Sequence, residues 1–202
     1  MANLGNYPST PAFSGVNFKI QTTTQQTTSL SQKRYRNSIG TTYFTATAQY
    51  PPMTRTEFRS VMAFLAKCQG PLNEFDIILP EISENQGDTA GSTPEVNGDQ
   101  AATTSTIAMD GFAFSVNVLK AGDLIRFTNH TKVYMVTDDV TSSGTGTANV
   151  NITPALVSGV SNNEAVTINN VLFRMTLNND SQEIAVGTTE LYQYEVDLIE
   201  VL

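Results

Sequence analysis

Residues 49–70 read QYPPMTRTEFRSVMAFLAKCQG, and no other stretch of the 202-residue sequence has the pattern of a helix. Thr54 followed three residues later by Glu57 is the pattern of a capping box, in which two side chains satisfy free amides at a helix N-terminus. Gly70, with a proline directly after it, ends the helical pattern. We therefore predict a helix over residues 54–68.

The predicted helix has an apolar face and a basic face. Its apolar residues recur at helical spacing, which is more typical of packing in a core than of a binding groove. Cys68 lies on this face, and we interpret it as a small core residue. In a protein that is otherwise β, such a helix usually covers a sheet or closes the open end of a barrel. The basic face, where we expect contact with a neighbouring subunit, carries Arg55, Arg59 and Lys67.

The composition favours β structure outside this helix. Hydrophobic residues make up 40% and charged residues 15% of the sequence, and Thr, Ser, Asn, Gln and Gly fill the difference. These residues favour strands and turns. Residues 41–50 alternate between apolar and polar side chains, which predicts a half-buried strand, and residues 74–80 predict a short buried strand. We predict a mainly β fold with one helix, in which a β-sheet or barrel domain is joined to a small β-barrel or β-sandwich domain.

A second group of strands follows residues 81–106, a segment rich in acids, Gly and Thr that indicates a boundary. Strand patterns over residues 119–140 and 148–152, and a hairpin over residues 165–177, predict the small barrel or sandwich.

The last strand pattern, over residues 189–202, needs partners, and we expect it to return to the first domain. Insertions succeed at exposed hairpin tips, which fits the acidic segment. The predicted first domain therefore comprises residues 1–90 and 180–202, and the inserted domain comprises residues 91–179.

The charge is divided unevenly along the chain. Residues 1–70 carry seven Lys and Arg and one acid, a net of +6, whereas residues 71–202 carry four Lys and Arg and eighteen acids, a net of −14. An acidic protein with one basic segment is a poor candidate for wrapping nucleic acid. Opposite charges on two parts of one chain favour head-to-tail association, which closes into rings where the rotation permits. The basic cluster that we expect at a subunit interface is Lys33, Arg34 and Arg36, with phosphate contact or simple solvation as the alternatives.

The motifs of common enzymes are absent from the sequence. A single cysteine excludes an internal disulfide and thiolate metal sites, and a single histidine, His130, lies where a hairpin turn is expected. Asp110, Asp123, Asp138 and Asp139 could in principle supply a glycosidase pair or a calcium site, but such turn aspartates are common in β proteins. We predict no catalytic, cofactor-binding or metal-binding residues and no cofactor.

The sequence carries no sign of a membrane segment. No run approaches the roughly 18 apolar residues that a membrane span needs. The opening residues, MANLGNYPST, lack the basic and apolar regions of a signal peptide, so we expect synthesis in a cytoplasm and no membrane partner.

Three segments in this order resemble phage distal tail proteins and related baseplate adaptors. KRYR (33–36), the alternating strand and YPPMTRTEFRSVMAFLAKCQGPLNEFDIILP (50–80) resemble their N-terminal domain, a sheet with one helix. VLKAGDLIRFTNHTKVYMVTDDVTSSGTGTANVNITPAL (118–156) is similar to their β-rich second domain. YQYEVDLIEVL (192–202) fits the closing strand of the first domain.

The resemblance implies a structural virion protein that forms a ring, typically hexameric, at the distal end of the tail tube. Its implied partners are further copies of itself, the tail tube protein, and the hub and baseplate proteins that bear fibres. DNA would only pass through the central channel, and an acidic lumen would keep it from adhering. The implied location is the tail of the virion, assembled in the host cytoplasm.

Other functions stay open at this point. Within phage structure, a tail-completion or head–tail joining protein is an alternative. From another class, a decoration or host-glycan-binding β module is possible, although glycan sites usually expose aromatic residues and the sequence has no Trp. A small β-rich hydrolase that uses Asp138 or Asp139 is a third hypothesis.

Overall fold

A computed structural model of the chain describes residues 1–40, 42–187 and 191–201. Positions 41, 189, 190 and 202, which fall in predicted strands, lie outside the described residues. Within the described ranges the protein is mainly β with one α-helix, as predicted. That helix is not long and apolar enough to cross a membrane.

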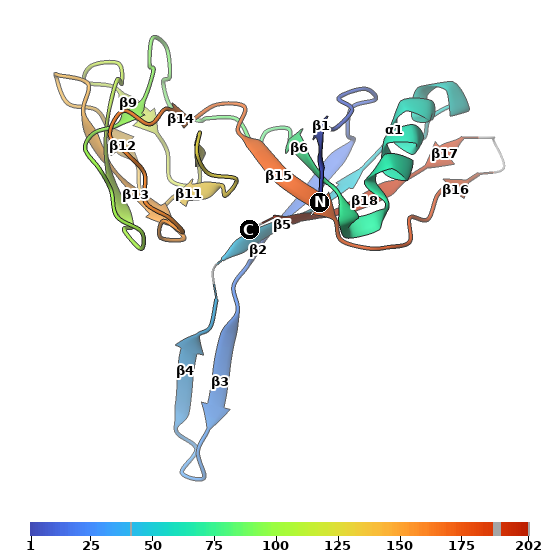
Figure 1. Cartoon of the computed structure of the whole chain (residues 1–202), viewed down its shortest axis with the longest axis horizontal. Coiled ribbons are helices and arrows are strands. Elements are labelled where there is room, and N and C mark those ends of the chain that lie inside the picture. Colours follow the sequence, from blue (N-terminus) through green and yellow to red (C-terminus); the bar gives the residue numbers. More distant parts are fainter. Residues whose placement is uncertain (41, 188–190, 202) are drawn as a thin grey trace.

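The first domain is built on a six-stranded sheet whose strands come from distant parts of the chain (Figure 1). Its strand order is β1-β6-β15-β18-β5-β2. The terminal strand β18 pairs antiparallel with β5 on one side and β15 on the other, which confirms that the end of the chain returns to this domain. The bounds are β1 Asn3–Asn6, β2 Gly15–Gln21, β5 Tyr43–Gln49, β6 Glu74–Ile78, β15 Leu172–Leu177 and β18 Glu195–Glu200.

Helix α1, Arg55–Cys68, confirms the predicted helix and its capping box. The Thr54 side chain accepts from the Glu57 amide, and the Glu57 carboxylate accepts from the Thr54 amide at 2.8 Å. Gly70 ends the helix in a left-handed conformation at φ 65°, together with the C-cap Gln69 at φ 53°, and it begins a 3-10 turn, η1 Gly70–Leu72. The helix buries one face against the sheet with Phe58, Val61, Leu65 and Cys68.

The second domain is a small, nearly closed barrel with the strand order β14-β10-β11-β13-β8-β7. A bridge between Glu95 and Ala165 brings its two edge strands together, and the Val166 amide donates to the Pro94 carbonyl at 3.0 Å. A barrel, rather than a sandwich, is therefore the form of this domain. The bounds are β7 Glu95–Val96, β8 Thr106–Asp110, β10 Leu124–Phe127, β11 Tyr134–Val136, β13 Ala148–Thr153 and β14 Val166–Thr167, with a short added pair of β9 Asn117–Leu119 and β12 Val140–Thr141.

The predicted hairpin over residues 165–177 is wrong. β14 pairs with β10 in the barrel, whereas β15 pairs with β6 and β18 in the first sheet. The segment between them is a crossing from one domain to the other. The division of the chain at residues 91 and 179 stays a prediction, and the strand pairing favours a boundary near residue 171.

The barrel packs on the same inner face of the sheet as α1, at the other end of β5. Phe44, Ala46 and Ala48 of β5 are buried on this face, and so is Tyr50, the residue after the strand. Tyr50 meets Phe58 of α1, with ring centroids 6.5 Å apart. Leu124 and Val133 of the barrel are buried in the core cluster that contains Phe44. Helix and barrel thus share one hydrophobic core beneath the sheet.

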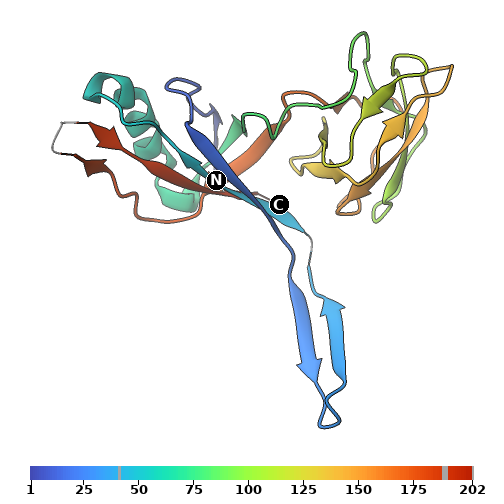
Figure 2. The ribbon, with the colours of Figure 1, turned by 180° about the vertical axis from the view of Figure 1, so that it is seen from behind.

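A free-standing hairpin extends the β2–β5 pair away from both domains (Figures 1 and 2). It consists of β3 Thr24–Thr28 and β4 Arg34–Ser38, and all ten of these residues are exposed. At the other end of the sheet, β16 Ala185–Val186 and β17 Tyr192–Gln193 form a second short pair.

Candidate subunit interface

The predicted basic cluster lies on the free-standing hairpin. Lys33 is in its turn, where the Ser29 amide donates to the Lys33 carbonyl at 2.9 Å, and Arg34 and Arg36 lie on β4. Leu30 at the tip and Tyr35 are also exposed, with the Lys33 ammonium 5.8 Å from the Tyr35 ring centroid. The hairpin therefore presents both positive charge and apolar surface.

The three basic residues of α1 form a separate surface. Arg55, Arg59 and Lys67 are all exposed on the side of the helix that faces away from the sheet. The hairpin and the helix lie at different ends of the sheet (Figure 1). The structure thus does not bring the six predicted interface residues together, and they define two basic surfaces.

Cations before and after residue 70 are used differently. Every Lys and Arg after residue 70 has an acidic partner: Lys120 with Asp139, Arg126 with Asp76, Lys132 with Glu200, and Arg174 with Asp76 and Glu74. None of the seven before residue 70 belongs to an ion pair among the described residues. The basic segment identified in the sequence is therefore positive charge without an acidic partner in the described part of its own chain.

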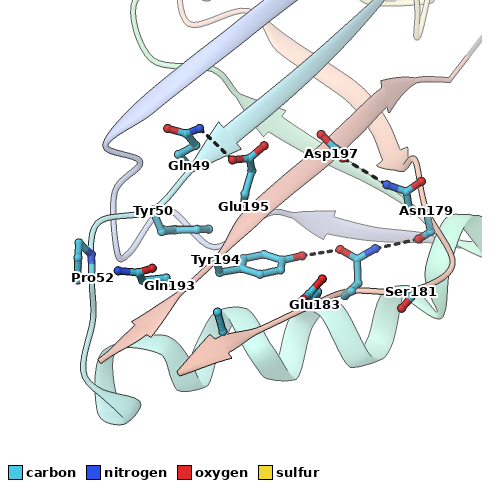
Figure 3. A pocket seen from close by; sticks show the side chains of 12 residues that line it. Gln49, Tyr50, Pro52, Asn179, Ser181, Glu183, Gln193, Tyr194, Glu195 and Asp197 are labelled. Atoms are coloured by element: carbon cyan, nitrogen blue, oxygen red, sulfur yellow. Dashed lines mark hydrogen bonds between the residues drawn. The ribbon is translucent and has the colours of Figure 1, made fainter. Parts of the chain in front are cut away.

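An acidic cleft of about 560 Å³ lies where β5 ends and β18 begins, and Figure 3 shows the residues that line it. Its carboxylates are Glu183, Glu195 and Asp197, and amides rather than cations hold two of them. Gln49 donates to Glu195 at 2.9 Å, and Asn179 donates to Asp197 at 3.2 Å. An amide leaves the carboxylate charge in place, so the cleft keeps negative charge that can attract a cation.

The aromatic rings beside this cleft do not form a platform for sugars. Tyr50 and Tyr194 are only 6% and 4% exposed. Their rings stack on each other with centroids 6.1 Å apart, and the Tyr194 hydroxyl donates to Gln182 at 2.6 Å. Since glycan sites usually offer an exposed aromatic face, the cleft does not favour the glycan-binding hypothesis.

Three of the four aspartates considered for hydrolysis or calcium binding have structural roles. Asp123 is buried and accepts from the Lys120 amide at 2.7 Å, which caps the turn before β10. Asp139 accepts from the Ala121 amide and from Lys120, and these bonds lower its pKa. Asp138 accepts from Asn151 at 3.0 Å. The described residues contain no group of three or more His, Cys, Asp or Glu suited to a metal ion.

His130 lies in the predicted turn between β10 and β11, but it is buried and hydrogen-bonded on both ring nitrogens. Its Nδ1 is 2.8 Å from the Tyr134 hydroxyl and its Nε2 is 2.7 Å from the Ser158 hydroxyl. The Tyr134 hydroxyl also accepts from the Val157 amide at 3.3 Å. These bonds tie the buried ring to β11 and to the segment after β13, which is a structural role for His130.

The first domain is a helix-backed sheet with an extended basic hairpin, and the protein carries a small barrel as its second domain. Residues 83–171 match the sequence-family model described as "Distal tail protein pb9, B domain". This segment runs from just after β6 to just before β15 and contains the whole barrel. The predicted resemblance to phage distal tail proteins is confirmed, and with it a structural role in the phage tail. No curated protein sequence matches the chain.

Proposed function

We propose that the protein assembles into a closed homo-oligomeric ring at the tail tip or baseplate, of six copies as the family resemblance implies. The ring would join the tail tube to the hub and fibre-bearing parts, and it would be assembled in the host cytoplasm. The observation that carries the proposal is the exposed hairpin. Two-stranded hairpins without further packing are marginally stable in water, so this one fits a role in which a neighbour covers it.

The contact that we propose joins unlike surfaces of successive copies. Strand β5 begins where the hairpin leaves the sheet and ends at Gln49 beside the acidic cleft. The basic hairpin and the acidic cleft therefore lie at opposite ends of one strand. A head-to-tail contact between the hairpin of one copy and the cleft of the next can repeat from copy to copy. The chain of copies forms a closed ring when the rotation between neighbours is a whole fraction of a full turn.

Charge complementarity supports this pairing. Arg34 and Arg36 need carboxylate partners, and Glu195 and Asp197 have no cationic partner among the described residues. Planar guanidinium groups bind carboxylates with two parallel hydrogen bonds, which gives orientation as well as attraction. The basic face of α1, with Arg55, Arg59 and Lys67, is proposed as a second contact with a neighbouring copy.

The excess of acid in residues 71–202 fits a channel for DNA. Of the three cations in the matched barrel segment, Arg126 and Lys132 are used in ion pairs with the first domain, and Lys120 pairs with Asp139. The exposed barrel surface is therefore predominantly acidic. We propose that this surface faces the lumen, where it repels the phosphates of passing DNA.

Electron microscopy and mass photometry of the purified chain test the ring. Wild-type protein should form closed rings at low salt and dissociate as salt screens the contact. Arg34→Glu with Arg36→Glu should abolish rings, and Glu195→Lys with Asp197→Lys should do the same. Mixing the two variants restores one matched contact between unlike copies, so mixed oligomers should form where neither variant assembles alone.

Two controls separate the proposed contacts. Arg55→Glu with Arg59→Glu reverses the same number of charges on the helix and reports on the second surface alone. Lys19→Glu changes a cation of the sheet that the proposal leaves out of the interface, and it should leave rings intact. A strict monomer at high concentration, with no affinity for a tube protein, would contradict the ring.

A further inference from the structure

The side chain of Glu200, the last residue of β18, is fully enclosed where the two domains and the hairpin root meet. Its residue is 4% exposed and its carboxylate side chain 0%. The residue lies opposite the start of β5, where the hairpin strands join the sheet. The C-terminal end of the chain lies beside this root in Figures 1 and 2.

The Glu200 carboxylate is held from two sides. From the hairpin root, the Phe44 amide donates to Oε2 at 3.0 Å. From the barrel, the Val133 amide donates to Oε1 at 2.9 Å, and the Lys132 ammonium donates to Oε2. The Lys132 ammonium also lies 4.4 Å from the centroid of the Phe44 ring. One carboxylate thus bonds strand β5 and the barrel turn at the same time.

Each of these groups depends on the others for its buried position. An ammonium and a carboxylate withdrawn from water are stable only when they neutralise each other and their remaining hydrogen bonds are made. A buried amide without an acceptor likewise costs the protein its lost hydration. Moving the barrel away from the sheet would break the bonds of Lys132 and Val133 and leave the charge of Glu200 bonded to Phe44 alone.

We propose that Glu200 is a coupling joint that holds the barrel and the hairpin root in one fixed relative position, so that neither is released without the other. The inserted barrel is then a rigid part of the subunit and not a tethered module. Whatever holds the hairpin sets the position of the barrel, and a force on the barrel reaches the hairpin root. The inference does not depend on ring formation, since every contact lies within one chain.

Only a carboxylate fits this position. A glutamine has one acceptor oxygen, and its amide nitrogen donates. If that oxygen faces Phe44 and Lys132, the nitrogen faces the Val133 amide, and the barrel keeps only the Lys132 bond, now to a neutral oxygen. If it faces Val133, the nitrogen faces the Phe44 amide and Lys132, and both of those bonds are lost. Glu200→Gln therefore removes the charge and at least one of the three bonds with the smallest change of shape.

Pulsed electron spin resonance measures the coupling directly. Spin labels at Gln21→Cys on the hairpin root and Ser161→Cys on the barrel report their separation, with labelled chains diluted in unlabelled protein. Cys68 is fully buried and burial raises its pKa to about 11, so it stays unlabelled. The distance distribution should be narrow in the parent and at least about twofold broader in Glu200→Gln. A second pair, Gln21→Cys with Thr56→Cys on α1, should stay narrow in both.

Glu84→Gln is the control, because it removes an exposed carboxylate that belongs neither to the Glu200 contacts nor to the proposed interface. It should leave both distributions unchanged. An equally narrow barrel distance in folded Glu200→Gln would overturn the coupling, as would a broad distance in the parent.

Hydrogen exchange of the backbone amides, measured in wild-type protein without spin labels, gives an independent test that needs no variant of Glu200. If one event opens the joint, the amides of Phe44 and Val133 should have protection factors that agree within about tenfold. Lys132→Met should lower both by the same factor. Protection of Phe44 that stays at the wild-type value while that of Val133 falls would show two independent contacts and refute the joint.

Discussion

Replacement of Lys132 by Met tests how much the enclosed ion pair contributes to folding. The Lys132 side chain is 2% exposed, and methionine fills nearly the same volume without a charge. The change leaves the Glu200 carboxylate buried with two amide donors and no cation. Removing one partner of such a pair costs about 3–5 kcal/mol, because the remaining charge is uncompensated. For a chain of this size, each kcal/mol lowers the melting temperature by about 2–4 °C, so we expect a fall of about 6–20 °C.

The double variant Lys132→Met with Glu200→Gln distinguishes the charge from the packing. In the double variant the site is neutral, and the glutamine side chain at position 200 still offers one acceptor oxygen. The remaining loss of free energy of unfolding is then that of one unsatisfied backbone amide, about 1–3 kcal/mol. Urea unfolding of both single variants and the double variant closes a cycle, in which the two single losses should sum to more than the double loss. Simple additivity, or a loss below about 1 kcal/mol for Lys132→Met alone, would refute the reasoning.

The pH dependence of the same variant supplies a further check on the sign of the effect. Burial raises the pKa of Glu200, and loss of the Lys132 charge raises it further. Folded protein then binds a proton more readily than unfolded protein does. The loss of free energy of unfolding in Lys132→Met should therefore be largest at neutral pH and should become smaller as the pH falls.

Three further variants test local features. Thr54→Ala removes the helix cap and should lower the free energy of unfolding by about 1 kcal/mol in urea titrations, whereas Thr56→Ala in the first turn should not. Gly111, at φ 77°, lies against the Thr93 carbonyl, so Gly111→Ala should lower the free energy of unfolding by more than about 2 kcal/mol in thermal unfolding. Gly91 has a similar φ of 73° but open space around it, so Gly91→Ala should lower the free energy of unfolding clearly less. Burial lowers the pKa of His130 below its ordinary 6.5, so the folded protein resists protonation and its free energy of unfolding should fall as the pH drops below 6.5. His130→Phe should lack this part of the pH dependence. An unchanged dependence of the free energy of unfolding on pH in that variant would contradict the prediction.

The parts of the fold that follow from local patterns were predictable from the sequence. The cap at Thr54 and Glu57 acts within four residues, so the start of α1 could be placed to within one residue. The alternation along β18 showed that it needs partners, although its actual neighbours, β5 and β15, could not be read from the pattern. Strand β15 was misplaced because the Asn169-Asn170 turn has the same local pattern in a hairpin and in a crossing between two sheets.

The joint at Glu200 could not be predicted, because it depends on contacts over long distances in the sequence. Lys132 and Glu200 are 68 positions apart, and Phe44 is 156 positions from Glu200. Neither Lys132 nor Glu200 lies in a recognisable motif, and the residues next to each of them give no sign that it is buried. His130 was placed correctly in a turn, but its contacts with Tyr134 and with Ser158, 28 positions away, could not be predicted.

The uneven charge of the sequence has two physical consequences that follow from where the cations lie. After residue 70 the acids greatly outnumber the cations, and each cation has an acidic partner. Arg126, Lys132 and Arg174 are largely buried, where low dielectric makes an unpaired charge costly and a paired one specific, whereas the Lys120 pair is exposed. Before residue 70 the cations are exposed, where water and salt weaken each contact but many together can steer an approaching partner. Lys132 therefore serves the internal geometry of the subunit, and Arg34 and Arg36 are suited to contacts between subunits.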